Sequence, residues 1–365
     1  MKPLAPAHVR DLVPYPPGKP IEEVRRELGI EGEVIKLASN ENALGPSPRA
    51  VEAAREAVAG VHRYPDGGGF YLKRRLSEHV GVSASRIALG NGSNDLIDLI
   101  LRAFVGPDEA GVISATTFVI YRMVLQGLGR QLREVPLSGL AYDLDAMAAA
   151  VDARTKVVFL ATPNNPTGLH LGAAALDRFL GRIPDGVVVV VDEAYAEYVT
   201  ADDYPDSVAL QARRPRTITL RTFSKAYGLA GLRCGYGVAS EEVVGLLDRV
   251  RQPFNCSAVA QAAALAALDD TAHIERSRRF NAEGIAQLSA GFEALGLSPV
   301  PTQANFVLVR LPRPGRPVYD ALLRRGVIVR PMDGYGLPDC LRITVGTPAE
   351  NVRCLDALGA VLRER

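Results

Sequence analysis

From about residue 86 to residue 222 the sequence repeats one pattern, in which a short β-branched run leads into a polar or glycine-rich turn and then a helical stretch. This alternation predicts an α/β fold with a mainly parallel sheet and helices on both faces. One strand candidate consists of valines alone, Val187 to Val191, and we expect it to be buried on both faces. The strand candidates are residues 87–89, 111–114, 157–161, 187–191 and 218–220.

The character of the sequence changes after about residue 270 and predicts a second, smaller α+β domain. Its expected elements are a long polar helix at 273–295, strands near 304–309, 327–329 and 341–345, and a closing helix at 348–362. Six prolines between Pro3 and Pro20 predict an extended arm that lies on the rest of the molecule. The expected division is an N-terminal extended arm at 1–20, a segment packing with the small domain at 21–50, a large domain at 51–269 and a small domain at 270–365.

The composition excludes several classes of protein. Lys and Arg number 42 against 41 Asp and Glu, which leaves a formal charge of +1. This charge gives no global field that would favour nucleic acid or an anionic membrane, so the expected partners are small molecules. No apolar run approaches the roughly 18 to 20 residues of a membrane helix, and the proline-broken start is not typical of a secretory signal.

The cysteines are widely spaced, with no CxxC pattern and no nearby histidine pair at metal-ligand spacing. We therefore expect free thiols, no metal site and a reducing, cytoplasmic location. The cysteines are Cys234, Cys256, Cys340 and Cys354.

Polar residues follow each predicted strand, and ligands gather at the carboxyl ends of the strands in open parallel sheets. The turn Gly90 to Asp95 follows the first strand and leads into an apolar helical run. Amide groups at a helix start bind phosphate well, although a simple strand-to-helix turn accounts for the same residues. The turn lacks the third glycine of the dinucleotide fingerprint, which disfavours a nucleotide-binding oxidoreductase.

Two chemically distinctive side chains follow the central strands. Asp192 comes directly after the valine run, where a buried carboxylate either caps the next turn or holds a protonated ring nitrogen of a cofactor. Lys225 follows residues 218–220 beside two hydroxyls, and a lysine in that setting can have a lowered pKa and form a Schiff base. Most lysines are solvated surface groups, so Lys225 alone decides nothing.

Two further strand ends suit a planar ring. The rigid turn at 162–168 could present the amide of Asn165, and Phe118 could lie flat on a ring or pack in the core. Together the strand ends supply a phosphate cradle, a stacking face, a carboxylate for a ring nitrogen, polar groups for a ring oxygen and a reactive amine. This set indicates a site for pyridoxal 5'-phosphate (PLP).

Motifs along nearly the whole chain carry a family resemblance. They are PYPPGKP, SNENALGPSP, RYPDGGGFYLK, LGNGSNDLI, PNNPTG, VVDEAYAEY, RTFSKAYGLAGLRCGYG, QANFVLV and VRPMDGYGLPDCLRITVGT. With them the sequence resembles the histidinol-phosphate aminotransferases, which are fold-type I PLP-dependent, class II aminotransferases. Ala43 and Thr116 stand where the family usually has proline, and these changes affect loop rigidity more than chemistry.

The resemblance implies roles for the residues around the ring and the reacting atoms. Lys225 would bind the cofactor aldehyde, and Asp192 would pair with the pyridine nitrogen. Tyr195 and Asn165 would contact the ring oxygen, and Phe118 would stack on the ring. Lys225, Asp192 and Tyr195 are thus the expected catalytic residues.

The resemblance also implies two sets of anion-binding residues and a homodimer. The phosphate-binding positions are Ser93, Asn94, Thr222, Ser224, Arg233 and, from the other subunit, Tyr64. The substrate-binding positions are Tyr15, Asn40, Arg330 and Arg342. The two arginines would bind the anionic end of the substrates.

The implied reaction is reversible amino transfer between L-histidinol phosphate and 2-oxoglutarate, which gives imidazole acetol phosphate and L-glutamate in histidine biosynthesis. One pocket must then accept a phosphate monoester and a dicarboxylic acid, and guanidinium groups bind both anions. An aromatic amino acid aminotransferase or a threonine-phosphate decarboxylase of the same subfamily would have the same catalytic core. An effector module of a transcription regulator would need an attached helix-turn-helix, for which the short arm leaves no room.

Overall fold

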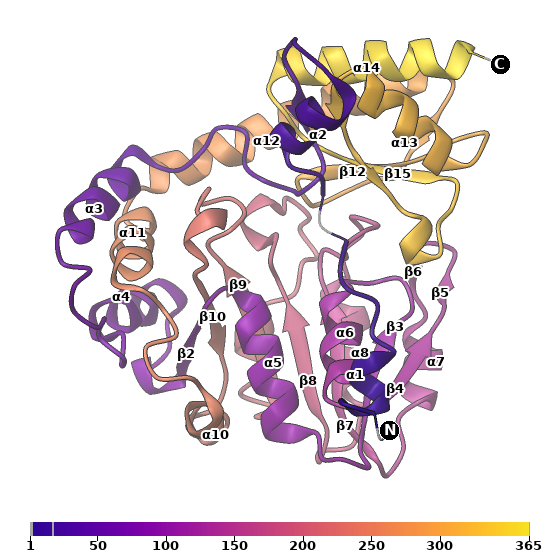
Figure 1. Cartoon of the computed structure of the whole chain (residues 1–365). Coiled ribbons are helices and arrows are strands. Elements are labelled where there is room, and N and C mark those ends of the chain that lie inside the picture. The colour runs from indigo at the N-terminus through magenta and orange to yellow at the C-terminus, as the bar shows by residue number, and fades with distance from the viewer. Residues whose placement is uncertain (1–2, 17, 365) are drawn as a thin grey trace.

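The computed structural model describes residues 3–16 and 18–364, and its largest element is a seven-stranded sheet (Figure 1). The strands are β2 (Ile87–Gly90), β3 (Ala110–Ser114), β4 (Gln131–Val135), β7 (Thr155–Ala161), β8 (Val188–Asp192), β9 (Thr217–Thr222) and β10 (Gly235–Val238). Their order is β2-β10-β9-β8-β7-β3-β4, and β10 runs antiparallel to both of its neighbours while the other pairs are parallel. The predicted α/β fold with a mainly parallel sheet is confirmed.

Helices cover both faces of this sheet. One face packs against α5 (Ser93–Phe104), α6 (Ile120–Gly127) and α10 (Glu241–Val250), and the other against α7 (Leu144–Ala149), α8 (Ala173–Leu180) and α9 (Ser207–Leu210). Successive valines of β8 alternate between these two cores, and each is at most 3% exposed. The period of two along a strand produces this alternation, and the expected burial of the valine strand on both faces is confirmed.

Two strands of the sheet were not expected from the sequence. β4 is an edge strand with mixed polar residues and partial exposure, so its pattern is weak. β10 carries glycines, which weaken the strand signal and mark a close backbone approach. A Cβ at Gly235 would lie 2.7 Å from the backbone nitrogen of Ser93, so this glycine lets β10 lie against the start of α5.

Three helices pack together beside β2 at one edge of the sheet: α3 (Pro48–Val58), α4 (Phe70–Val80) and α11 (Ala258–Leu268). Ser47 begins α3 by accepting hydrogen bonds from the backbone nitrogens of Arg49 and Ala50, and Pro48 occupies the first helical position.

A smaller unit lies above this sheet in Figure 1. Its four-stranded sheet has the order β11 (Ser298–Pro299), β12 (Phe306–Arg310), β15 (Cys340–Thr344) and β14 (Arg330–Pro331). It packs with α12 (Thr271–Ala294), α13 (Gly315–Arg324) and α14 (Pro348–Arg363) in one apolar core. The expected helices at 273–295 and 348–362 correspond to α12 and α14 within two residues.

The segment before α3 crosses between the two units. Helix α2 (Ile21–Leu28) and strand β1 (Ile35–Lys36) belong to the small unit: β1 pairs in parallel with β13 (Val327–Ile328), and Val24 lies in the same core. From Pro48 the chain packs on the large unit, through the contacts of α3 with α11.

The N-terminal arm differs from its expected form at one place. Residues 7–10 form a helical turn, α1 (Ala7–Arg10), which lies against α6. These four residues contain no proline, so their backbone nitrogens can donate: Arg10 N donates to Pro6 O at 3.1 Å. The expectation of an extended arm is therefore wrong at this turn, and residues 1, 2 and 17 of the arm lie outside the described residues.

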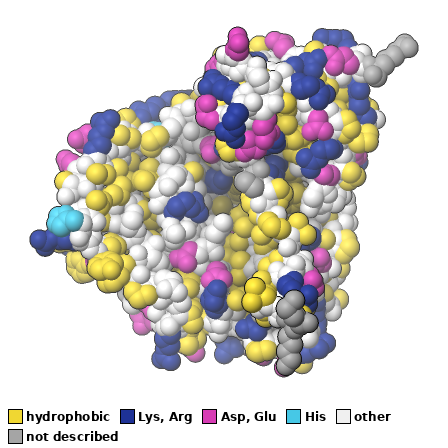
Figure 2. Space-filling view, viewed as in Figure 1, with side chains coloured by type: hydrophobic (Ala, Val, Ile, Leu, Met, Phe, Trp, Pro, Cys, Tyr) yellow, Lys and Arg dark blue, Asp and Glu magenta, His cyan; other side chains and the backbone are white. Residues whose placement is uncertain are grey.

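The remaining elements are short: the hairpin of β5 (Leu137–Ser138) and β6 (Ala141–Tyr142), and the turns η1 (Ala84–Arg86), η2 (Ala196–Tyr198), η3 (Ala230–Leu232) and η4 (Asp333–Tyr335). Within residues 3–16 and 18–364, no helix has the length and apolar character needed to cross a membrane. On the face shown in Figure 2, positive and negative side chains are interspersed.

Candidate active site

A cavity of about 280 Å³ lies at the carboxyl ends of the central strands, between the large sheet, the small unit and the N-terminal arm. Every site residue expected from the sequence lines it except Tyr64. The expected residues in its wall are Tyr15, Asn40, Ser93, Asn94, Phe118, Asn165, Asp192, Tyr195, Thr222, Ser224, Lys225, Arg233, Arg330 and Arg342. The sequence pattern thus predicted which distant segments meet at one place.

Asp192, the last residue of β8, is a buried carboxylate with one satisfied oxygen. Its Oδ2 accepts a hydrogen bond from the hydroxyl of Tyr121 at 2.6 Å, whereas its Oδ1 has no partner among the described residues. Burial raises the pKa of Asp192 to about 6, and the bond from Tyr121 acts in the opposite direction. A buried, unpaired carboxylate oxygen in a cavity wall fits a cationic N–H donor such as a protonated pyridine nitrogen.

Lys225 faces the same cavity from the turn after β9. Its Nζ lies 3.3 Å from the carbonyl oxygen of Ser39 and 5.7 Å from the ring centroid of Tyr195. Burial, and then the positive charge of Arg342, lower the pKa of Lys225 to about 8. A larger share of this amine is therefore neutral near pH 7, as attack on a carbonyl carbon requires.

The start of α5 forms one side of an anion-binding corner. Gly92 precedes it with φ +80°, and the backbone nitrogens of Ser93 and the following residues have no preceding helical turn to bond to. A Cβ at Gly92 would lie 2.3 Å from Nη2 of Arg233, so only glycine allows this guanidinium to lie against the helix start. Nη1 of Arg233 lies 3.4 Å from Oγ of Ser224, which in turn accepts from Oγ1 of Thr222 at 3.0 Å.

Tyr195 and Asn165 stand on the wall beside Asp192. The amide of Asn40 donates to the hydroxyl of Tyr195 at 2.8 Å. Burial raises the pKa of Tyr195 to about 12, so its hydroxyl keeps its proton and remains a donor at neutral pH. Asn165 accepts through Oδ1 from Nη1 of Arg342, which links the ring side of the cavity to its substrate side.

Two arginines of the small unit face the cavity without a carboxylate partner. Arg342, on β15, is 6% exposed, donates to the carbonyl oxygen of Ala38 at 2.7 Å and lies 5.2 Å from the ring centroid of Phe306. The guanidinium of Arg330 lies 5.2 Å from the ring centroid of Tyr15 on the arm. Neither forms an ion pair within the described part of the chain, so both are available to an anionic ligand.

The structure adds residues that the sequence interpretation missed. Tyr335 of η4 lines the cavity, and the hydroxyl of Tyr121 on α6 donates to Asp192. Tyr121 lies three positions after the stacking candidate Phe118, a spacing that could have drawn attention to it, and the two rings meet edge-on with centroids 5.6 Å apart.

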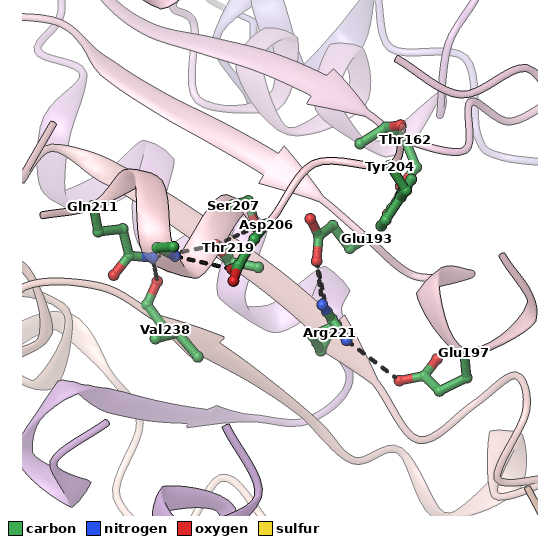
Figure 3. Close-up of polar contacts among 11 residues, drawn as sticks. Thr162, Glu193, Glu197, Tyr204, Asp206, Ser207, Gln211, Thr219, Arg221 and Val238 are labelled. Atoms are coloured by element: carbon green, nitrogen blue, oxygen red, sulfur yellow. Dashed lines mark hydrogen bonds and ion pairs between the residues drawn. The ribbon is translucent and has the colours of Figure 1, made fainter. Parts of the chain in front are cut away.

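A charged network lies next to the cavity, and the sequence interpretation missed it too (Figure 3). Glu193 directly follows Asp192 and its side chain is fully buried; its Oε2 accepts from Nε of Arg221 at 2.7 Å. Nη1 of the same arginine lies 3.9 Å from Glu197. One guanidinium thus lies within 4 Å of two buried carboxylates next to the cavity.

Tyr64 is the predicted site residue that the structure places elsewhere. It is 83% exposed, lies outside the cavity and stacks on Phe254 with ring centroids 4.7 Å apart. Other large apolar side chains are exposed on α3, on α4 and in the segment between these helices, and Figure 2 shows hydrophobic side chains gathered at the left edge of the molecule. These are Val58, Val61, Phe70 and Tyr71.

Comparison with known proteins places the chain in a family. The model described as aminotransferase class I and II matches residues 32–358. "Histidinol-phosphate aminotransferase 2" of Pseudomonas aeruginosa is 53% identical over 98% of both chains. "Histidinol-phosphate aminotransferase" of Anaeromyxobacter sp. is also 53% identical, over 99% of both.

Solved structures agree with the sequence matches. The crystal structure of histidinol-phosphate aminotransferase from Sinorhizobium meliloti, in complex with pyridoxal-5'-phosphate, has a TM-score of 0.90 and 30% identity. The match covers 99% of this chain and 98% of that one. The chain belongs to the class I and II aminotransferase family, in the group of its histidinol-phosphate aminotransferase relatives.

Proposed function

We propose that this protein is a PLP-dependent histidinol-phosphate aminotransferase of histidine biosynthesis. It transfers the amino group reversibly between L-histidinol phosphate and 2-oxoglutarate, giving imidazole acetol phosphate and L-glutamate. The observation that carries the proposal is the pairing of a cavity lysine of lowered pKa with a buried aspartate that has one unpaired oxygen. The full-length relatives at about half identity supply the substrate assignment.

Different cavity residues would bind different parts of PLP. The start of α5 with Ser93 and Asn94, together with Thr222, Ser224 and Arg233, would bind the phosphate. Phe118 would lie against the ring, and Tyr195 and Asn165 would donate to the ring oxygen. Asp192 would keep a proton on the ring nitrogen, because a buried carboxylate stabilises an adjacent cation. The bound cofactor supplies an electron-withdrawing ring that stabilises negative charge at the substrate carbon.

Lys225 has two successive tasks. Its neutral amine would first bind the cofactor aldehyde through Nζ, and the substrate amine would then displace it. The released Nζ stays in the cavity and would take the proton from the substrate carbon that carries nitrogen, then deliver it as an acid. A pKa of about 8 suits both directions of this proton transfer near neutral pH.

Arg330 and Arg342 would allow one pocket to accept two different anions. Histidinol phosphate lacks an α-carboxylate and presents a phosphate monoester, whereas 2-oxoglutarate presents two carboxylates. A guanidinium fork binds either group, and neither arginine is occupied by a carboxylate in the described part of the chain. Tyr15 and Asn40 would complete the substrate side, the first from the arm.

The proposal includes a homodimer and a cytoplasmic location. Tyr64 does not line its own cavity and is exposed among other apolar side chains, which is consistent with a role in the phosphate site of a second subunit. The cysteines are buried and unpaired, which suits a reducing compartment.

The substrate assignment is tested by comparing amine donors on the purified protein. With 2-oxoglutarate as acceptor, kcat/KM for histidinol phosphate should exceed that for phenylalanine or tyrosine by far. The reverse order would make the protein an aromatic amino acid aminotransferase, and carbon dioxide release from threonine phosphate would make it a decarboxylase. Protein that stays colourless with PLP and carries no borohydride-labelled peptide at Lys225 would exclude all three.

A further inference from the structure

Tyr121 is a fully buried tyrosine that the roles described above do not use. Its hydroxyl donates to Oδ2 of Asp192 at 2.6 Å, the one hydrogen bond of this hydroxyl within the described residues. Its ring stacks on Phe159 with centroids 4.4 Å apart and meets Phe118 edge-on at 5.6 Å. The contacts with Phe159 and Phe118 therefore fix the ring, and the hydroxyl points at Asp192.

The position of Tyr121 in the chain explains how it reaches Asp192. Its backbone nitrogen lies 3.3 Å from the carbonyl oxygen of Phe118, so both residues belong to the turn that begins α6. Phe118 precedes α6 and Tyr121 lies in its first turn, and both side chains lie at the carboxyl ends of the strands: Phe118 lines the cavity and Tyr121 bonds to Asp192. One turn thus supplies the stacking candidate and a donor to the aspartate.

We propose that Tyr121 is a positioning residue, which binds one oxygen of Asp192 so that the other oxygen is presented, as an anion, to the ring nitrogen of the cofactor. This inference rests on the proposed function, because it assumes that PLP occupies the cavity. The unpaired oxygen is Oδ1 of a residue in the cavity wall, and it is the atom that Tyr121 leaves free. Without the tyrosine hydroxyl the carboxylate loses its side-chain donor, and the backbone nitrogen of Ala194 is then the hydrogen-bond donor that still lowers its pKa.

The charge on Asp192 depends on several neighbours. Burial is the largest influence and raises its pKa, and Glu193 acts in the same direction. The hydrogen bonds from Tyr121 and from the backbone of Ala194 lower it, as does the charge of Lys225. The other titratable groups around it are the phenols of Tyr142, Tyr195 and Tyr204. Removal of the Tyr121 hydroxyl therefore raises the pKa of Asp192 further, and the carboxylate takes up a proton at a higher pH than in the natural protein.

The test is Tyr121→Phe, which keeps the ring and its stacking and removes one hydroxyl. The matched control is Tyr204→Phe: Tyr204 is partly buried, and its hydroxyl also donates at 2.6 Å, but to the carbonyl oxygen of Thr162. For each reconstituted enzyme we would measure the dissociation constant of PLP, the absorbance spectrum against pH, and kcat and KM against pH. In Tyr121→Phe, PLP should bind about tenfold more weakly and the acid limb of kcat should move up by about one pH unit, with KM for the amine donor unchanged.

Three outcomes decide the proposal. It holds if the control keeps the natural PLP affinity and acid limb while Tyr121→Phe changes both. It is overturned if Tyr121→Phe behaves as the natural protein, or if both variants change alike, because the effect is then one of packing. In an Asp192→Asn background, Tyr121→Phe should add no further loss of PLP affinity, and an additive loss would also overturn it. Failure of the proposed function is distinct, since the natural protein itself would then form no coloured complex with PLP.

Discussion

Arg221→Met tests the charged network of Glu193, Arg221 and Glu197 next to the cavity. The guanidinium of Arg221 bonds to Glu193 at 2.7 Å and lies 3.9 Å from Glu197 (Figure 3). The side chain of Glu193 is 0% exposed, so removing its partner leaves a carboxylate with no water to solvate it. Breaking one side of a buried pair costs about 3–5 kcal/mol, and methionine replaces most of the lost volume. We expect a loss of this size in the free energy of unfolding at pH 8.

The same substitution should make stability depend on pH with a definite sign. Burial raises the pKa of Glu193 above the ordinary value of 4.5, and Arg221 opposes that rise. A carboxyl whose pKa is raised on folding keeps its proton in the folded state after the unfolded chain has lost it, so stability falls as pH rises above 4.5. In the variant the opposing charge is gone, and this fall becomes steeper, by up to about 1.4 kcal/mol per pH unit for each carboxyl.

The assay is urea unfolding of the PLP-loaded enzyme, followed by circular dichroism at pH 5 and pH 8. Arg213→Met is the matched control, because Arg213 pairs with Asp177 at 2.8 Å with side chains 67% and 50% exposed. Such a surface pair contributes about 0–1 kcal/mol, so the control should stay near the natural protein at both pH values. An Arg221→Met penalty that is equal at the two pH values, or no larger than that of the control, would refute the reasoning.

Three further substitutions test the cavity. Lys225→Ala should abolish transamination while the protein folds and binds PLP non-covalently; natural turnover in this variant would exclude the assigned role. Asp192→Asn keeps the shape but not the charge, and should lower kcat by about 100-fold or more at saturating donor, since the ring nitrogen loses its ionic partner; an unchanged kcat would contradict this. Gly92→Ala places a Cβ 2.3 Å from Arg233 at φ +80° and should weaken PLP binding at least tenfold by fluorescence titration, whereas Gly231→Ala, with open space around it, should not.

The sequence predicted much of the large sheet, because side chains alternate along a strand with a period of two. It also predicted which residues share one cavity, because those residues follow the ends of neighbouring strands. A run such as Val187 to Val191 can be buried on both faces only inside a sheet covered by helices, and the structure places β8 there. Polar residues that end neighbouring parallel strands must meet at one edge, which is why Asp192, Lys225 and Asn165 line one cavity. Sequence separation does not matter for such residues, because the sheet brings their strands together.

What the sequence did not predict depends on tertiary contacts that have no local pattern. The bond from Tyr121 to Asp192 joins residues 71 positions apart, and the one local signal for it is that Tyr121 lies three positions after Phe118. β10 was missed because its glycines suit a close backbone approach rather than a strand signal. The turn at 7–10 has no distinct sequence signal, because its four residues lie between prolines that favour an extended chain, although they contain no proline themselves.

Asn40 shows why the cavity needs both units of the fold. Its backbone nitrogen donates to Oγ1 of Thr344 on β15 at 3.0 Å, and its amide donates to Tyr195 after β8 at 2.8 Å. Its φ of 55° is tolerated because asparagine adopts the left-handed region more readily than most residues. Two residues earlier, the carbonyl oxygen of Ala38 accepts from Arg342. An anion bound by Arg342 would therefore contact a guanidinium that is hydrogen-bonded to the crossing segment at Ala38. The same segment is hydrogen-bonded, through Asn40, to the hydroxyl of Tyr195, which is expected at the cofactor ring. Oδ1 of Asn40 also accepts from Oγ1 of Thr344 at 3.1 Å. An aspartate at position 40 would keep this bond, but it could not donate to Tyr195 and so would break the connection.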